Sequence, residues 1–452
     1  MKSSWVLMHT GWSMTELLDA LSASARAAAR PLRFGQVTQM VGMSIEVVGI
    51  PAAIGECLVL LPSQRRVFAE VVALRDDRVV CLALGETNGI RVGTKVTSLG
   101  GPLSVRVGPH LLGRVLDGLG RPIDGGPAVV GADVSVAGTP PHPLRRGLVN
   151  EQLPLGVRVL DGLIPCGKGQ RLGIFAGSGV GKSSLMSMIA RGTAADVTVV
   201  ALIGERGREV AEFIERDLGP EGLARSIVVV ATSDAPSVMR IRAAFTATRI
   251  AEWFRDQGKD VVLMMDSVTR FAMAQREVGL AAGEPPATRG YPPSVFGLLP
   301  RLLERAGLGE RGSITGLYTV LVEGDDMNEP IADTARSILD GHIQLSRSLA
   351  ESNHFPAVDV LSSISRVAPA VATPEQLSQA GDVRELLAAW RDSKDLIEID
   401  AYVAGTNPVV DRALVMKPAI DAFCKQAMSE RSDLGSAREG LATLVSSVGG
   451  DA

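Results

Sequence analysis

The sequence is poor in the residue types from which stacking surfaces, metal centres and redox sites are built. Aromatic residues make up 4% of the 452 residues, so few side chains could stack on nucleic-acid bases. The cysteines and histidines are scattered without paired spacing, which excludes a zinc or redox motif and gives no support for a Ser-His arrangement. We expect the four cysteines, Cys57, Cys81, Cys166 and Cys424, to be buried and to pack like small hydrophobic residues. Their scattered positions suit a protein of a reducing compartment.

Long apolar runs and an excess of positive charge are also missing. No apolar run reaches the roughly 18 residues that a membrane helix needs, and the N-terminus lacks the core of a signal peptide. Lys and Arg total 46 against 50 Asp and Glu, a net charge of -4, so no nucleic-acid partner is expected. These absences predict a soluble, cytoplasmic protein, and its length allows two to four domains.

One stretch dominates what is present: Ala176-Gly177-Ser178-Gly179-Val180-Gly181-Lys182-Ser183, with an apolar run before it and a helical pattern at residues 184–190 after it. Its glycines allow backbone N–H groups to point into one anion-sized hollow at a helix N-terminus. A usual first Gly is replaced by Ala176, but the flanking strand and helix favour a phosphate-binding loop over an ordinary Gly-rich turn. The predicted nucleotide-binding residues are Gly177, Ser178, Gly179, Val180, Gly181, Lys182, Ser183 and Ser184.

This motif needs a cation and a hydroxyl, and the sequence supplies both. Lys182 would contact the phosphates, and the hydroxyl of Ser183 would ligate a magnesium ion shared between the β- and γ-phosphates. Asp266 ends an apolar run at residues 261–265, where a second magnesium-organising group is expected; alternatively it is only a helix cap. The predicted metal residues are therefore Ser183 and Asp266.

A second carboxylate follows the apolar run at residues 197–203. Glu205 would emerge from a strand end beside the phosphate loop, where it could orient and polarise water for attack on the γ-phosphate. Spacing alone equally allows that Glu205 and Glu209 merely pair with neighbouring Arg side chains. Arg206, next in the stretch, is also counted as a candidate catalytic residue.

Periodicity divides the chain into four parts. Residues 1–34 contain a capping box at Ser13 and a short amphipathic helix, which could pack on its own chain or dock on a partner. Short apolar segments broken by turns at residues 35–108 predict a closed β-barrel. Apolar strands alternating with helices at 109–370 predict a parallel sheet covered on both faces. Helical periodicity at 371–452 predicts a C-terminal bundle.

These motifs resemble the catalytic subunits of rotary F- and V-type ATPases, and most closely the protein-export ATPases of type III secretion systems, flagellar or injectisome. The matching stretches beyond the phosphate loop lie at residues 116–124, 166–175, 203–210, 265–272, 290–294, 322–330 and 363–367. The resemblance implies an α/β protein with an N-terminal β-barrel, a central RecA-like P-loop ATPase domain and a C-terminal helical domain.

It also implies ATP and Mg²⁺ as ligands, at the interfaces of a hexamer. Arg366 would reach into the neighbour's site, because one chain's loop supplies no second cation for the γ-phosphoryl charge; alternatively Arg366 binds local backbone or pairs with Asp359. Two aromatic residues would flank the adenine: Phe355, where Tyr is more familiar, and Tyr402. The implied catalytic residues are Lys182, Glu205, Asp266 and Arg366.

The resemblance further implies a stalk or regulator protein, chaperones and exported proteins as partners, and peripheral association with an inner-membrane export gate. Asn328 favours the flagellar members, since injectisome members frequently have Thr there. Three other classes share parts of the pattern: a non-catalytic rotary subunit, a Rho-type RNA translocase and an ATP synthase β-subunit. The three candidate residues Lys182, Glu205 and Asp266 argue against the first, the scarcity of aromatics against the second, and Lys-Ser instead of Lys-Thr against the third.

Overall fold

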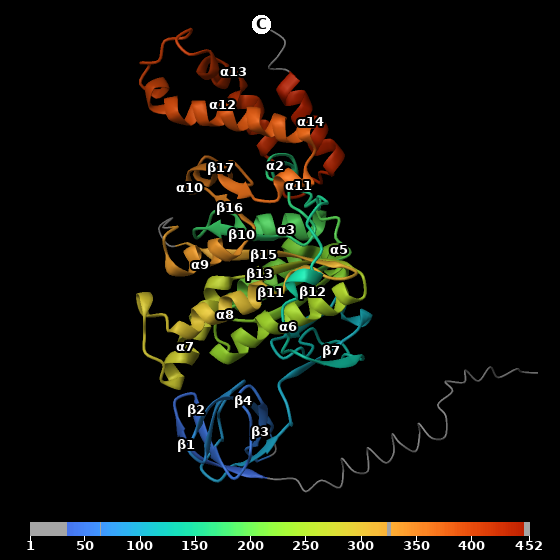
Figure 1. The fold of residues 1–452 in the computed structure, drawn as a ribbon, viewed down its shortest axis with the longest axis vertical. Coiled ribbons are helices and arrows are strands. Elements are labelled where there is room, and N and C mark those ends of the chain that lie inside the picture. The colour runs from blue at the N-terminus through green and yellow to red at the C-terminus, as the bar shows by residue number, and fades with distance from the viewer. Residues whose placement is uncertain (1–33, 64, 323–326, 447–452) are drawn as a thin grey trace, which may run out of the picture. The chain divides into compact units, whose positions relative to one another are not determined.

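The computed structural model describes residues 34–63, 65–322 and 327–446 (Figure 1). The amphipathic helix expected near Ser13 lies outside the described residues. Two compact units divide the chain: Met1–Cys81 with Thr87–Gly101, and Leu82–Glu86 with Pro102–Ala452. The domain boundaries expected at residues 34, 108 and 370 stay predictions.

The first unit contains the expected barrel, closed from six strands. Side chains alternate between the interior and the outside, as in β2, where Ile45 and Val47 are fully buried. Pairing of Gly35 with Val96 joins the first strand to the last and leaves no free edge. The strand order is β1 (Gly35–Val41), β2 (Ser44–Val48), β5 (Arg78–Ala83), β4 (Val67–Arg75), β3 (Cys57–Leu61) and β6 (Lys95–Ser98).

The second unit is built on a nine-stranded sheet, and its central strands are the apolar runs of the sequence. Every residue of β11 is buried, which explains why its sequence is apolar without alternation. Neighbouring strands pair in parallel from β16 to β8, so their carboxyl ends lie together. We call this end of the sheet its carboxyl edge, and the end where these strands begin its amino edge. The order is β17 (Val358–Ser365), β16 (Gly341–Leu345), β10 (Arg171–Ala176), β15 (Ser313–Leu321), β13 (Asp260–Asp266), β11 (Val197–Ile203), β12 (Ser226–Ala231) and β8 (Val115–Asp117), with β14 (Gly307–Leu308) beside β15.

Helices cover both faces of this sheet. Figure 1 shows α3 (Lys182–Gly192) on one side and α6 (Ser237–Asp256) and α8 (Pro293–Leu303) on the other. The predicted RecA-like layering is therefore confirmed. The remaining helices of this region are α2 (Arg158–Leu163), α4 (Gly207–Glu212), the π-helix η3 (Phe213–Leu218), α5 (Gly219–Ala224), α7 (Val268–Ala282), the 3₁₀ helix η4 (Thr288–Gly290), α9 (Pro330–Ile338), α10 (Arg347–Glu351) and α11 (Ala368–Val371).

The C-terminal bundle is also present and is tied to α2 by hydrogen bonds. It consists of α12 (Pro374–Glu398), α13 (Pro408–Cys424) and α14 (Leu434–Ser446), and Thr373 caps α12 by accepting from the Gln376 N–H. Arg158 donates to the carbonyls of Phe423 and Lys425 at 2.8 and 2.6 Å. The bundle is thus held on the nucleotide-binding region by charge-assisted bonds as well as by apolar packing.

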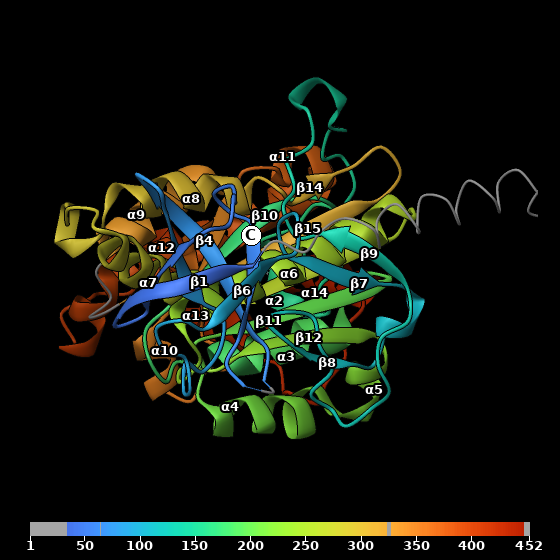
Figure 2. The ribbon, with the colours of Figure 1, turned by 90° about the horizontal axis from the view of Figure 1, so that it is seen from below.

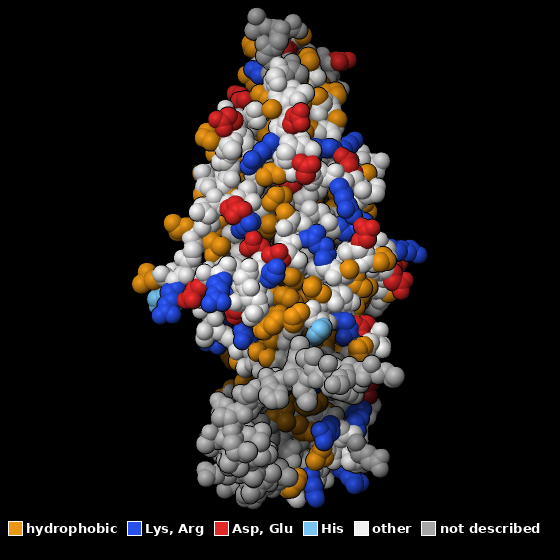
Figure 3. Space-filling model, turned by 90° about the vertical axis from the view of Figure 1, so that its right-hand side faces the viewer, with side chains coloured by type: hydrophobic (Ala, Val, Ile, Leu, Met, Phe, Trp, Pro, Cys, Tyr) orange, Lys and Arg blue, Asp and Glu red, His pale blue; other side chains and the backbone are white. Residues whose placement is uncertain are grey.

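The connection before this region is less regular, as expected from its turns. It contains the 3₁₀ helices η1 (Pro109–Leu111) and η2 (Pro143–Arg145) and a small sheet of β7 (Ser104–Val107) with β9 (Ala132–Ser135). On the face drawn in Figure 3, Lys and Arg side chains of the described residues are interspersed with Asp and Glu. All four cysteines are buried and free, as the sequence predicts.

A fully buried ion pair links α6 to the segment after α8. The guanidinium of Arg305 donates to both carboxylate oxygens of Glu252 at 2.7 and 2.6 Å, and to the carbonyl of Val136 at 3.1 Å. The two side chains are 1% and 3% exposed. Removing Glu252 would leave the buried Arg305 charge with only the Val136 carbonyl, whereas Glu252 also pairs with Arg249 at 3.0 Å.

We expect Glu252→Ala to lower the free energy of unfolding by about 3–5 kcal/mol, because it strands the Arg305 charge in the interior. The matched control is Glu212→Ala, which breaks the exposed pair with Arg208 and should cost about 1 kcal/mol or less. Denaturant unfolding followed by circular dichroism measures both. Equal losses in the two variants would contradict the assignment.

Candidate functional site

The phosphate loop leaves the end of β10 and turns directly into α3. Gly181 is the N-cap of α3 with φ 90°, and Gly179 has φ 78°, both in the left-handed region where glycine is favoured. Val180 between them is buried at 2% exposure, while Ser178 and Ser183 face solvent. The loop is therefore anchored by one apolar side chain and presents its backbone and hydroxyls outward at a helix N-terminus.

Three charged side chains meet beside this loop, each supplied by a different strand end. Lys182 Nζ lies 2.5 Å from Asp266 Oδ1 and 3.6 Å from Glu205 Oε1. Asp266 is the last residue of β13, and Glu205 comes two residues after β11. Because β10, β13 and β11 are parallel, the topology brings these residues to one edge. The structure thus brings the three candidates together, although Lys182 and Asp266 are 84 positions apart in the sequence.

The sequence did not predict one further member of this cluster, Thr319. Its hydroxyl donates to Asp266 Oδ1 at 2.7 Å from the adjacent strand β15. A Thr in a buried apolar strand carries no motif by itself. Only the pairing of β15 with β13 shows its place, and this hydrogen bond holds the Asp266 carboxylate in position.

The cluster has one cation for two carboxylates. Burial and the nearby Asp266 carboxylate raise the pKa of Glu205 to about 7, against the opposing effect of Lys182. Burial disfavours the charged form of Lys182, but the carboxylates of Asp266 and Glu205 outweigh it and raise its pKa. A polyphosphate at the loop would compete with both carboxylates for the same ammonium group.

Both simpler alternatives for these carboxylates are wrong. The cap of α7 is Ser267, whose hydroxyl accepts from the Arg270 N–H at 3.2 Å, so Asp266 is not the helix cap. The carboxylate that pairs with a local Arg side chain is Glu209, whose Oε1 lies 3.3 Å from a guanidinium nitrogen of Arg206. Glu205 faces Lys182 instead, and its buried Oε1 accepts no hydrogen bond from the described residues.

Arg206 is not brought into this cluster. Its side chain is 75% exposed and pairs with Glu209 on the solvent side of α4. A catalytic role for Arg206 therefore gains nothing from the geometry and stays a prediction.

The two aromatic candidates have different surroundings. A Cβ on Gly181 would lie 3.3 Å from the Phe355 ring, so this ring borders the phosphate loop, and it is 40% exposed. Tyr402 lies between α12 and α13, where its hydroxyl is 2.9 Å from Asp411 Oδ1 and accepts the Asn407 N–H at 3.2 Å. The described hydrogen bonds of Tyr402 join it to its own connection and to the adjoining ends of α12 and α13, so its adenine contact remains a prediction.

Arg366 lies at the amino edge of the sheet, whereas the phosphate loop lies at the carboxyl edge. It follows β17, which runs antiparallel to β16, and its N–H donates to the Asp340 carbonyl at 3.0 Å. Asp340 in turn binds Arg171, the first residue of β10, whereas the loop follows the last residue, roughly 17 Å further along the strand. The Arg366 side chain is exposed, and its one described contact is a 3.5 Å approach to the Arg336 carbonyl. Asp359 is occupied instead by Ser362 and backbone N–H groups.

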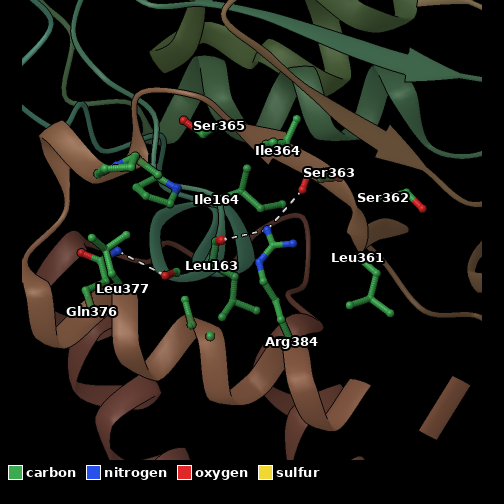
Figure 4. Close-up of a pocket in the computed structure, with 16 residues that line it drawn as sticks. Leu163, Ile164, Leu361, Ser362, Ser363, Ile364, Ser365, Gln376, Leu377 and Arg384 are labelled. Carbon is green, nitrogen blue, oxygen red and sulfur yellow. Dashed lines mark hydrogen bonds between the residues drawn. The ribbon is translucent and has the colours of Figure 1, made fainter. Parts of the chain in front are cut away.

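A pocket of about 420 Å³ lies next to Arg366, between β17, α11, α12 and the end of α2 (Figure 4). Figure 4 shows Arg384 pointing from α12 toward Leu163 and Ser363. Its guanidinium donates to their carbonyls at 3.3 and 3.2 Å and to that of Val360 at 2.6 Å. This charge is therefore already satisfied, and the pocket is separate from the phosphate loop.

Family models match three successive parts of the chain. The β-barrel domain of the ATP synthase alpha/beta family matches residues 37–100, and its nucleotide-binding domain matches residues 156–365. The T3SS EscN ATPase C-terminal domain matches residues 372–443. The chain belongs to the ATP synthase alpha/beta family.

Within this family, the chain is similar to export ATPases of both kinds. It is 52% identical to the flagellum-specific ATP synthase of Bacillus subtilis (strain 168), over 93% of this chain and 96% of that one. It is 51% identical to the type 3 secretion system ATPase of Xanthomonas euvesicatoria, over 93% and 95%. The solved structure of assembled EscN from enteropathogenic E. coli matches with a TM-score of 0.86 and 47% identity, over 91% of this chain and all of that one.

These matches confirm the family resemblance drawn from the motifs. The chain is an ATPase of this branch of the ATP synthase alpha/beta family, which excludes a Rho-type RNA translocase. No helix among the described residues is long and apolar enough to cross a membrane. Within the same residues, no three His, Cys, Asp or Glu side chains cluster as ligands of a metal.

We expect Glu205→Gln to stabilise the nucleotide-free protein, and increasingly so as pH rises from about 4.5 to about 7. A carboxyl whose pKa is raised by folding binds a proton in the folded state through this window, so its ionisation destabilises the folded state as pH rises. Apparent Tm against pH measures the difference between variant and wild type. Glu212→Gln, which changes an exposed carboxylate paired with Arg208, is the control; a pH-independent difference for Glu205→Gln would contradict the raised pKa.

Proposed function

We propose that this chain is the ATPase of a type III protein-export apparatus, specifically the flagellar one, and that it hydrolyses ATP to drive the unfolding and export of substrate proteins. The observation that carries the proposal is the meeting of Lys182, Glu205 and Asp266 beside the phosphate loop. The names of the relatives supply the export context. A non-catalytic subunit would not need all three groups.

The residues at the loop fit a magnesium–nucleotide complex. Ser183 offers an exposed hydroxyl, and Asp266 offers a carboxylate oriented by Thr319, which are oxygen ligands of the kind Mg²⁺ prefers. The ion, when bound by these two residues, would neutralise part of the phosphate charge. Lys182 would leave its ion pair with Asp266 to contact the phosphates, which frees that carboxylate for the metal side of the site.

Glu205 would orient and polarise the attacking water. Its Oε1 is buried and accepts no hydrogen bond from the described residues, so it is available to a water molecule. A pKa near 7 suits a group that accepts a proton at neutral pH. Phe355 would border the adenine side, where a Phe ring keeps the stacking face of Tyr.

Arg366 would act on the neighbouring subunit. Its position at the opposite edge of the sheet from its own phosphate loop supports a site shared between two chains. The relative EscN has been solved in an assembled form and in a complex with its central stalk EscO. By analogy we propose a hexamer that engages a stalk protein, chaperones and exported proteins in the cytoplasm, peripheral to the inner-membrane export gate.

The virulence-type secretion ATPase is the close alternative. The two kinds of relative are similar at 52% and 51% identity, which does not separate them. Asn328 is the residue that favours the flagellar assignment. The same ATPase chemistry applies in either case.

We expect Glu205→Gln to keep nucleotide affinity while turnover falls by roughly 10²–10⁴-fold, because the amide keeps the shape but cannot accept the proton. Lys182→Ala should lose turnover with an unchanged circular dichroism spectrum. Magnesium-dependent phosphate release and binding of a fluorescent ATP analogue measure the two quantities.

The matched control is Glu212→Gln, which makes the same change at an exposed carboxylate paired with Arg208 and should retain turnover. If affinity and turnover fell together in Glu205→Gln, Glu205 would be structural. Normal turnover in Lys182→Ala would contradict the site assignment itself.

A further inference from the structure

Residues 139–148 form a loop that presents two leucines to solvent. Leu144 is 91% exposed and Leu148 is 86% exposed, the highest values among the large hydrophobic side chains of the described residues. Figure 2 shows the loop, in teal, projecting from the molecule near α11. Single exposed hydrophobic residues are ordinary, but two on one short projecting loop need an explanation.

The loop is held in its shape by its own chemistry. Pro140, Pro141 and Pro143 restrict the backbone, and the His142 ring accepts from the Leu144 N–H at 3.2 Å. Arg146 anchors the loop by donating to the Pro141 carbonyl at 3.2 Å and pairing with Glu304 at 3.1 Å. A rigid apolar projection loses little conformational entropy on binding, which is the property of a preorganised docking element.

The loop lies at the same edge of the sheet as Arg366. A Cβ on Gly167 would meet Val149 Cγ1 at 2.3 Å and Val367 Cγ2 at 3.2 Å, so both valines pack on this glycine. Leu148 directly precedes the first valine and Arg366 directly precedes the second. The end of the loop at Leu148 and the backbone of Arg366 therefore lie close together in the fold.

We propose that this loop docks on a second copy of this chain, the copy whose phosphate loop receives Arg366, and that Leu144 and Leu148 are its apolar anchors. The proposal rests on the shared site proposed above. In a head-to-tail ring, the amino edge of each sheet, which carries Arg366, would face the carboxyl edge of the next chain, which carries the phosphate loop. Anchoring beside Arg366 fixes where the guanidinium enters the neighbouring site, and apolar anchors surrounded by charged groups are the usual anatomy of such interfaces.

The test is the double variant Leu144→Ser with Leu148→Ser in the full chain. Both side chains are exposed, so the apparent Tm of the monomer should not change. The protein concentration that gives half-maximal ATPase specific activity, and half-maximal hexamer by native mass measurement, should rise about tenfold or more. The plateau turnover at high concentration should stay within about twofold of wild type, because Lys182, Glu205 and Arg366 are intact.

The matched control is Val415→Ser on α13, where the side chain is 78% exposed. It should assemble at the wild-type concentration. A double variant that also assembles like wild type overturns the docking role, including the case where the loop binds an exported protein or a lipid surface instead. If wild type forms no oligomer at any concentration, the shared site fails as well, so the two failures are distinguishable.

A second measurement identifies the partner directly. Because the four native cysteines are buried, a maleimide benzophenone can be attached selectively to Leu144→Cys. Illumination of hexamers should give cross-links between two copies, mapped by peptide mass to the edge that carries the phosphate loop. Cross-links found only within one chain, in a sample shown by mass to be hexameric, would overturn the proposal.

Discussion

The direction of the strands in the nine-stranded sheet is the constraint on which the functional assignments depend. The parallel strands β10, β13 and β11 end at one edge and deliver Lys182, Asp266 and Glu205 within a few ångströms of one another. The strand β17, antiparallel to its neighbour β16, ends at the opposite edge and delivers Arg366 there. The reversal of direction at β17 thus separates Arg366 from the phosphate loop of its own chain.

Without nucleotide, the charged side chains beside the phosphate loop interact with one another. One buried ammonium faces two carboxylates, and the excess negative charge is relieved by the raised pKa of Glu205. Binding of a magnesium–nucleotide complex would replace the Lys182–Asp266 ion pair by contacts of each partner with the ligand. The pair would thus hold both side chains near the positions proposed for them before the ligand binds.

The sequence predicted the central strands and the three clustered charged residues because buried parallel strands are continuous apolar runs and the phosphate loop has a fixed motif. It did not predict β1, β8, β16 or β17, which are short or only half-buried and lack such runs. The place of Thr319 beside Asp266, and that of the loop at residues 139–148 near Arg366, depend on contacts between segments far apart in the chain. The local sequence likewise does not predict which residues surround the Tyr402 and Arg206 side chains.

The most direct test of a shared site is complementation between two inactive chains, Arg366→Ala and Lys182→Ala, mixed in equal amounts and shown by mass to form mixed oligomers. Random pairing joins an intact phosphate loop to an intact Arg366 at about a quarter of the interfaces of a closed ring. A shared site should restore ATPase activity up to about that fraction of wild type, since an arginine supplied in trans is worth roughly 10³–10⁵ in rate. Mixed oligomers without any recovery would contradict it.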